Sequence, residues 1–155
     1  MNGSKTRIYH LLRALARQHE VRLISFIRSG EIVDKDAAGS FCQEIKTVPF
    51  HEFRPASLRA MLGYLSQQPR AVVDTYSLDM AKELNSQAGW ADCIIASELV
   101  TASYFRNIGK PCVWDDLEIG SGLDAWRSVN GVSRLRRWLT WQKTTRYVRR
   151  LFPLF

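Results

Sequence analysis

The sequence lacks an apolar run as long as the roughly 18 residues that a membrane-spanning helix needs, and it opens with no signal peptide. It also lacks paired cysteines: Cys42, Cys93 and Cys112 are odd in number and far apart, and the last two lie inside apolar runs. This usage predicts reduced, buried thiols and a cytoplasmic protein. No Cys or His pair stands at metal-ligand spacing, so a metal site is not expected. No bound cofactor is expected either.

Acidic residues are missing from one long stretch near the C-terminus. From Arg127 to Arg150, both included, the chain has eight basic residues and no acidic one, and its net charge is +7. This asymmetry favours an anionic partner, which leaves a phosphate-bearing ligand, a membrane surface and nucleic acid open. Nucleic acid is the least supported of the three, because no recognisable reading motif accompanies the charge. A solvated basic helix face explains the pattern equally well.

The same stretch predicts a basic amphipathic helix over 133–152, whose apolar positions recur three or four residues apart. Tryptophan and arginine together on such a helix suit the headgroup region of an anionic bilayer. We therefore expect Arg136, Arg137, Trp138 and Trp141 to face a membrane surface, which would make the protein peripheral on the inner face of the membrane. The alternative is that the apolar stripe packs against a sheet and the arginines are solvated.

What the sequence does contain is an alternation of apolar strands and amphipathic helices. The run at 90–97 is continuously apolar, as in a parallel strand covered on both faces. The alternation predicts a doubly wound α/β fold, and the length fits one domain, with an α/β core at 1–118 and a linker and basic helix at 119–155. The predicted strands are 21–27, 45–49, 90–97 and 112–114; the predicted helices include a short one around 34–42 and longer ones at 57–67, 77–87, 98–106 and 133–152.

The chain begins with Gly3-Ser4-Lys5-Thr6-Arg7, followed by an amphipathic helix and the strand at 21–27. These elements form the second half of a βαβ unit, whose first strand has no counterpart before the glycine. A helix N-terminus beside two basic side chains can hold a phosphate group, so Gly3, Ser4, Lys5 and Arg7 are candidate substrate-binding residues. An ordinary helix start with solvated charges is the alternative.

The stretch GSKTRIYHLLRALARQHEVRLISF resembles the start of family-4-type GT-B glycosyltransferases, especially the bacterial exopolysaccharide sugar transferases. Gly3, Lys5, Arg7, His19 and Val21 match the family's pattern, whereas Ser4 replaces its usual aspartate. The run DCIIAS resembles the fourth strand of the family's N-terminal domain, and the W-x-K-x-x-R-Y-x-R pattern resembles a helix that crosses that domain.

This resemblance implies a Rossmann-like acceptor-side domain without its first strand and without the C-terminal donor domain. The family moves a sugar from a nucleotide-sugar co-substrate to an acceptor hydroxyl, without a bound metal. We expect a glycan or lipid-linked acceptor in polysaccharide biosynthesis. The fragment alone should be inactive and should bind nucleotide sugars weakly. Because it lacks a central strand, we also expect it to be unstable. The alternative is a non-enzymatic α/β binding module that docks on a membrane or a partner protein through its basic helix.

Polar side chains follow two predicted strands at their carboxyl ends, where open α/β sheets bind ligands. Ser97 and Glu98 end the strand at 90–97, a position that lines the acceptor cleft in the resembling family. Glu98 is a candidate general base for an acceptor hydroxyl, or a plain acid at a helix start. Asp115, a second catalytic candidate, is followed by Asp116 and Glu118, which we expect to bind sugar hydroxyls; a plain acidic loop is the alternative.

Overall fold

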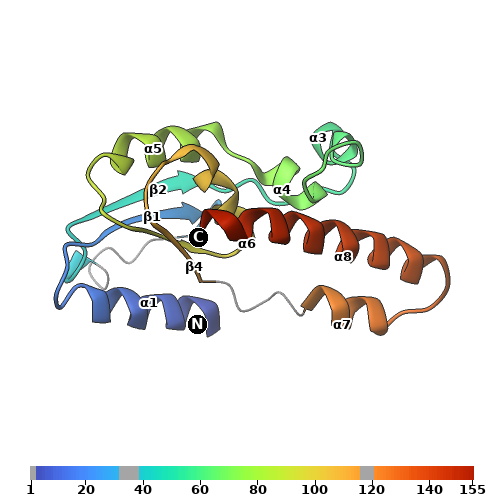
Figure 1. The fold of residues 1–155 in the computed structure, drawn as a ribbon, viewed down its shortest axis with the longest axis horizontal. Coiled ribbons are helices and arrows are strands. Elements are labelled where there is room, and N and C mark those ends of the chain that lie inside the picture. The colour runs from blue at the N-terminus through green and yellow to red at the C-terminus, as the bar shows by residue number, and fades with distance from the viewer. Residues whose placement is uncertain (1–2, 32–38, 116–120) are drawn as a thin grey trace. The chain divides into compact units, whose positions relative to one another are not determined.

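The computed structural model describes residues 3–31, 39–115 and 121–155 and shows a mixed α/β protein with parallel strand pairs (Figure 1). The predicted α/β class is therefore confirmed. The chain divides into two compact units, Met1–His51 and Glu52–Phe155. Among the described residues, none of the helices combines the length and the apolar character needed to cross a bilayer.

The first unit is a helix followed by two parallel strands. α1 spans Gly3–Leu15, β1 spans Arg22–Ile27 and β2 spans Glu44–Pro49. β1 and β2 pair in register along their whole length, from Arg22 opposite Glu44 to Ile27 opposite Pro49. The predicted first helix and both strands are thus confirmed, while most of the short helix expected around 34–42 lies outside the described residues.

The second unit contains the remaining elements and a second parallel pair, in which β3 and β4 run from Ile94 opposite Cys112 to Ser97 opposite Asp115. Its elements in chain order are α3 (Leu58–Leu62), α4 (Arg70–Thr75), α5 (Leu78–Ala88), β3 (Ile94–Ser97), α6 (Leu99–Ala102), the 3-10 helix η1 (Ser103–Asn107), β4 (Cys112–Asp115), α7 (Ser121–Arg127), α8 (Gly131–Leu151) and the 3-10 helix η2 (Phe152–Leu154).

The core of the second unit joins α4, β3, α6, η1 and the C-terminal half of α8. Tyr147 and Leu151 supply the α8 contribution, and both are fully buried. Ala102 and Phe105, from α6 and η1, are also buried. The core members are Val72, Ala96, Ala102, Phe105, Tyr147 and Leu151.

Several expectations in the second unit were wrong in detail. β3 begins at Ile94, so Cys93 precedes the strand and is exposed, whereas Cys42 is buried and Cys112 is half-buried. Ile95 and its neighbour in register, Val113, are both exposed, so this strand pair is not covered on both faces among the described residues. The predicted helix at 57–67 ends at Leu62, because a turn at 63–69 separates α3 from α4.

Two further differences concern helices. The sequence predicts a linker between residue 119 and the basic helix, where the structure has the short helix α7 at Ser121–Arg127. The predicted helix at 98–106 is α6 continued as the tighter helix η1. The predicted helix at 133–152 is confirmed as α8.

Candidate functional site

Two predicted site residues lie at one edge of the second strand pair. Ser97 and Asp115 are the last residues of β3 and β4 and stand opposite each other in the parallel register. Both are half-buried, and the exposed Glu98 follows Ser97 directly. Parallel strands end at a common edge, so the structure brings these three side chains to one place. Asp116 and Glu118 lie outside the described residues.

Glu98 has an unusual backbone conformation, with φ 81° and ψ 152°. This region is almost exclusive to glycine, because a side chain there crowds the backbone. The Thr101 hydroxyl lies 2.5 Å from the carbonyl oxygen of Ser97 and 2.9 Å from that of Glu98, so its proton is shared between them. The turn that carries Glu98 is therefore strained and held in place by the next helical turn.

Aromatic rings pack beside this edge. The indole ring of Trp114 lies 5.8 Å from the rings of both Phe152 and Phe155, measured between centroids. Trp114 Nε1 and the buried hydroxyl of Tyr147 have no hydrogen-bond partner among the described residues. Burial raises the pKa of Tyr147, so its hydroxyl stays protonated and can donate.

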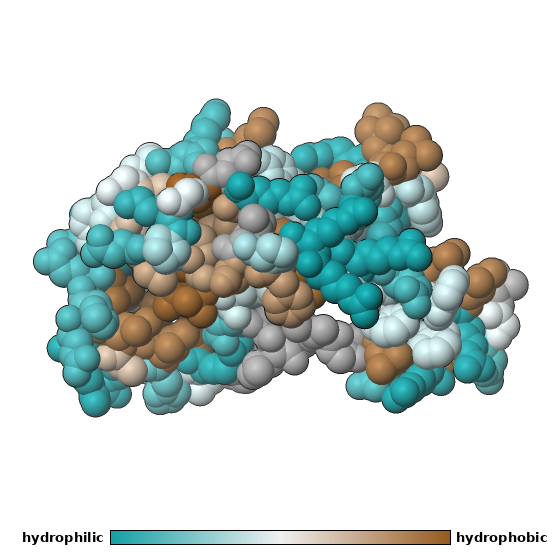
Figure 2. Space-filling model, viewed as in Figure 1, coloured by the Kyte–Doolittle hydropathy of each residue, from teal (hydrophilic) through white to brown (hydrophobic). Residues whose placement is uncertain are grey.

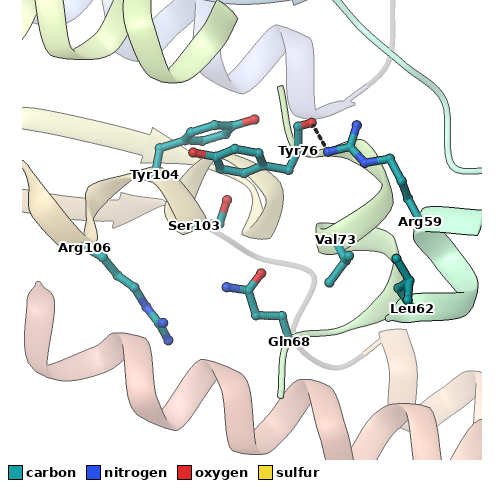
Figure 3. A pocket seen from close by; sticks show the side chains of 8 residues that line it. All are labelled: Arg59, Leu62, Gln68, Val73, Tyr76, Ser103, Tyr104 and Arg106. Atoms are coloured by element: carbon teal, nitrogen blue, oxygen red, sulfur yellow. Dashed lines mark hydrogen bonds between the residues drawn. The ribbon is translucent and has the colours of Figure 1, made fainter. Parts of the chain in front are cut away.

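The second unit also has a cavity of about 460 Å³, lined in part by residues of η1, the 3-10 helix that follows α6 (Figure 3). Figure 3 shows the Tyr76 and Tyr104 rings lying face to face, with centroids 4.9 Å apart and planes 19° from parallel. The Ser77 N–H donates to the Tyr104 hydroxyl at 2.9 Å, which fixes that ring. Burial raises the pKa of Tyr104. The cavity is lined by Arg59, Leu62, Gln68, Val73, Tyr76, Ser103, Tyr104 and Arg106.

Two arginines give this cavity a positive charge, and no carboxylate is among its lining residues. Arg59 donates to the carbonyl oxygen of Tyr76 at 3.0 Å, and Arg106 lies 5.7 Å from the centre of the Tyr147 ring. With the Gln68 amide, these groups suit a ligand that presents oxygen atoms. Sequence reasoning missed the cavity, because its residues are spread over three separate segments and share no spacing.

The predicted phosphate-binding group lies in the first unit, at the start of α1. Lys5 Nζ pairs with Glu31 Oε1 at 3.1 Å, and the backbone N–H of Arg28 also donates to the Glu31 carboxylate. The Lys5 hydrogen bond lowers the pKa of Glu31, which favours the ionised carboxylate. Lys5 thus has a carboxylate partner, which favours the alternative of an ordinary helix start. Gly3, Ser4 and Arg7 belong to the same helix.

The predicted membrane-facing residues lie in the N-terminal half of α8. Trp138 is 37% exposed, and Arg136 is exposed. Arg137 donates to the carbonyl oxygen of Ala125 at 2.8 Å, and the Trp141 ring stacks on that of Trp126 at 6.0 Å. Arg137 and Trp141 thus contact α7 and help to hold the two helices together, whereas Arg136 is exposed and Trp138 lines a shallow hollow with Trp126 of α7.

The described residues hold no cluster of three or more metal-ligating side chains. Comparison with known proteins adds no family: no family model, no curated protein and no solved structure matches this chain.

Proposed function

We propose that this chain is the acceptor-side domain of a GT-B glycosyltransferase, which moves a sugar from a nucleotide sugar to a glycan or lipid-linked acceptor in polysaccharide biosynthesis. The proposal rests on the resemblance of residues 3–26 and 92–97 to family-4-type transferases. The parallel strand pairs and their flanking helices support it at the level of α/β class. The Rossmann-like, doubly wound sheet is part of the proposal.

The observation that carries the proposal is the meeting of Ser97, Glu98 and Asp115 at the carboxyl ends of β3 and β4. In the reaction, the acceptor hydroxyl oxygen bonds to the anomeric carbon of the donor, and the bond from that carbon to the nucleoside diphosphate breaks. Glu98, as an exposed carboxylate, takes the hydroxyl proton. Ser97 and Asp115 hold neighbouring sugar hydroxyls by hydrogen bonds.

The cavity supports an acceptor role for this unit. Its stacked tyrosines offer an aromatic face for a sugar ring, and its arginines and Gln68 offer donors for hydroxyl or acidic oxygen atoms. An acceptor bound in the cavity beside η1 would have to extend along α6 to reach Glu98 and the strand ends.

Acceptor binding tests the proposal directly. The purified chain is presented with an array of neutral and acidic glycans, and each hit is titrated by saturation-transfer NMR. We expect saturable binding that weakens about tenfold in Glu98→Gln and is unchanged in the exposed control Glu52→Gln. Calorimetry with nucleotide sugars should show no saturable binding, since donor recognition in the resembling fold belongs to another domain. Tight nucleotide-sugar binding without glycan binding would overturn the assignment.

A second candidate function is a non-enzymatic module that docks through the N-terminal half of α8. The observation in its favour is the exposure of Arg136 and Trp138 on α8, a helix that carries further basic residues. If it is correct, Arg136→Glu with Arg137→Glu abolishes binding to anionic vesicles, whereas the same charge change at Arg13 and Arg17 does not. No glycan would then bind.

A further inference from the structure

The most exposed apolar surface of the second unit lies on α3 and the turn that follows it. Figure 2 shows these apolar side chains gathered over the position that α3 has in Figure 1. Leu65 is 89% exposed and Leu58 is 77% exposed. Soluble surfaces seldom expose large apolar side chains in such a cluster without a partner. We call this set the α3 surface; it comprises Leu58, Met61, Leu62, Tyr64 and Leu65.

The packing of α3 fixes this outward orientation. Its inward residues are small: Ala60 is 0% exposed, and Gly63 is buried. A Cβ atom at Gly63 would stand 2.9 Å from Cα of Arg70, so the backbone of α3 lies directly against α4. The side of α3 that faces α4 is therefore occupied by small residues, and the large side chains lie on its exposed side, where Leu62 also lines the cavity described above.

Arg70 holds the α3 surface in one conformation. Its guanidinium donates to the carbonyl oxygens of Ala60 and Pro55 and to the Tyr64 hydroxyl, at 2.9, 2.5 and 2.7 Å. It also lies 4.0 Å from the centre of the Tyr64 ring. The α3 surface is thus presented in a fixed shape, which lowers the conformational entropy lost on docking.

The margin of the α3 surface is basic. Residues 53–73 include Arg54, Arg59 and Arg70 and no acidic residue. From α8, Lys143 donates to the carbonyl oxygen of Gly63 at 2.5 Å, and Arg150 hydrogen-bonds the side chain of Gln67. Arg70 from α4 and Lys143 and Arg150 from α8 therefore border the apolar side chains, while the carboxylate of Asp74, which accepts a hydrogen bond from Ser57, is buried.

We propose that the α3 surface docks this protein on an anionic lipid bilayer. The leucines and Met61 enter the region just below the headgroups, where apolar side chains leave water. Tyr64 remains at headgroup depth, with its ring in the apolar layer and its hydroxyl in the polar one. The surrounding cations meet lipid phosphates. This surface is distinct from the N-terminal half of α8, and its docking does not depend on sugar transfer.

The test is co-sedimentation of the full chain with vesicles of phosphatidylglycerol and phosphatidylcholine, or of phosphatidylcholine alone. We expect binding to the anionic vesicles, at least about tenfold weaker binding to the neutral ones, and further weakening from about 0.1 to about 0.5 M salt. Leu58→Ser with Leu65→Ser should lower binding about tenfold or more. The matched control is Leu78→Ser, an exposed leucine on α5.

A depth measurement separates the α3 surface from α8. The chain's tryptophans all lie outside α3, so Leu65→Trp adds one emitter whose extra fluorescence should be quenched by brominated lipid. Circular dichroism verifies that each variant keeps the wild-type melt. The proposal is overturned if the serine variant binds vesicles as the wild type does, or if Leu65→Trp gains no quenching. It is equally overturned if the wild type forms a dimer that the serine variant converts to a monomer, because a second copy would then cover this surface.

Discussion

Glu98 holds a backbone conformation that costs about 1–3 kcal/mol for a residue with a side chain. We therefore predict that Glu98→Gly raises the free energy of unfolding by about 1 kcal/mol, since glycine relieves this strain but loses about 0.5–1 kcal/mol of chain entropy. Urea denaturation at neutral pH measures the change. Glu98→Ala is the control, because it removes the carboxylate and keeps the strain. A glycine variant no more stable than the alanine variant would contradict the argument.

Asp74 is a buried carboxylate that stabilises the start of α3. It accepts a 2.7 Å hydrogen bond from the Arg54 N–H and another from the Ser57 hydroxyl, whose oxygen in turn caps Ala60 N–H at 2.9 Å. Burial alone would raise the pKa of Asp74, but the hydrogen bonds from Ser57, Arg54 and Ala60 and the charge of Arg59 together outweigh it, so the pKa is lowered. The ionised form is thus favoured in the folded protein.

The pH dependence follows from that lowered pKa. Asp74 contributes stability fully above the ordinary aspartate pKa of about 3.9, and this contribution is lost as the pH falls through the lower folded-state pKa. We predict that Asp74→Asn costs about 1–3 kcal/mol at pH 7 and that the difference from wild type shrinks at acid pH. Urea titrations at several pH values measure it, with the exposed Asp79→Asn as control. A difference independent of pH would contradict the assignment.

Some of the site residues could be predicted from the sequence and others could not. Ser97, Glu98 and Asp115 could be placed together because each follows a strand, and parallel strands end at one edge. The cavity could not be found, because Tyr76 and Tyr104 come from segments whose contact depends on packing. The strain at Glu98 was also invisible, since no residue type signals it there.

Among the elements, α3 packs closely against α4 at Gly63. Gly63 has ordinary helical φ, so an alanine there gains no strain from the backbone, but its Cβ would lie 2.9 Å from Arg70 Cα and 3.0 Å from the Ala60 carbonyl oxygen. We predict that Gly63→Ala lowers the free energy of unfolding by about 1–3 kcal/mol. Thermal or urea melts measure this.

Gly89 provides the matched control, because it also ends a helix with ordinary helical φ and has nothing within 4 Å of a built Cβ. Gly89→Ala should be neutral or stabilise by up to about 1 kcal/mol. If both variants lose the same stability, the cause is helix ending in general and not the packing of α3 on α4.

Element prediction from sequence succeeded where periodicity was strong. β1, β2 and α8 match the predicted ranges closely, because their apolar positions recur regularly. The burial of those positions was harder to predict. In α3 the apolar face points outward, and in α8 the stripe divides: Val148 is buried, whereas Trp138 is exposed. Periodicity shows which residues share an apolar face, but it does not show whether that face packs against another element or meets solvent.

At the scale of the whole molecule, the second unit depends on the C-terminal half of α8. Leu151 is 0% exposed and belongs to the core with Val72 and Phe105. We predict that Leu151→Ala costs about 2–5 kcal/mol, through lost burial and the cavity left behind. Denaturant melts followed by tryptophan fluorescence measure it. The neighbouring Phe152→Ala, at an exposed position, should cost much less; equal losses would show that the helix end, not the core, is responsible.

The sequence predicted an α/β class correctly at this scale, because strands and helices alternate along the chain. It did not reveal the two compact units that divide at His51. No glycine- or proline-rich linker stands at that point, and the boundary is set by which segments contact each other, a property that composition does not record.

The division at His51 also has a consequence for the order of events on the ribosome. Every contact within the first unit joins residues up to 51, so these contacts can form once those residues have emerged. β3 is complete at Ser97, yet its core partners Tyr147 and Leu151 arrive much later. At a synthesis rate of about 5–20 residues per second, this apolar strand lacks its core partners for several seconds. During that interval the nascent second unit is the segment of this chain that most needs a chaperone.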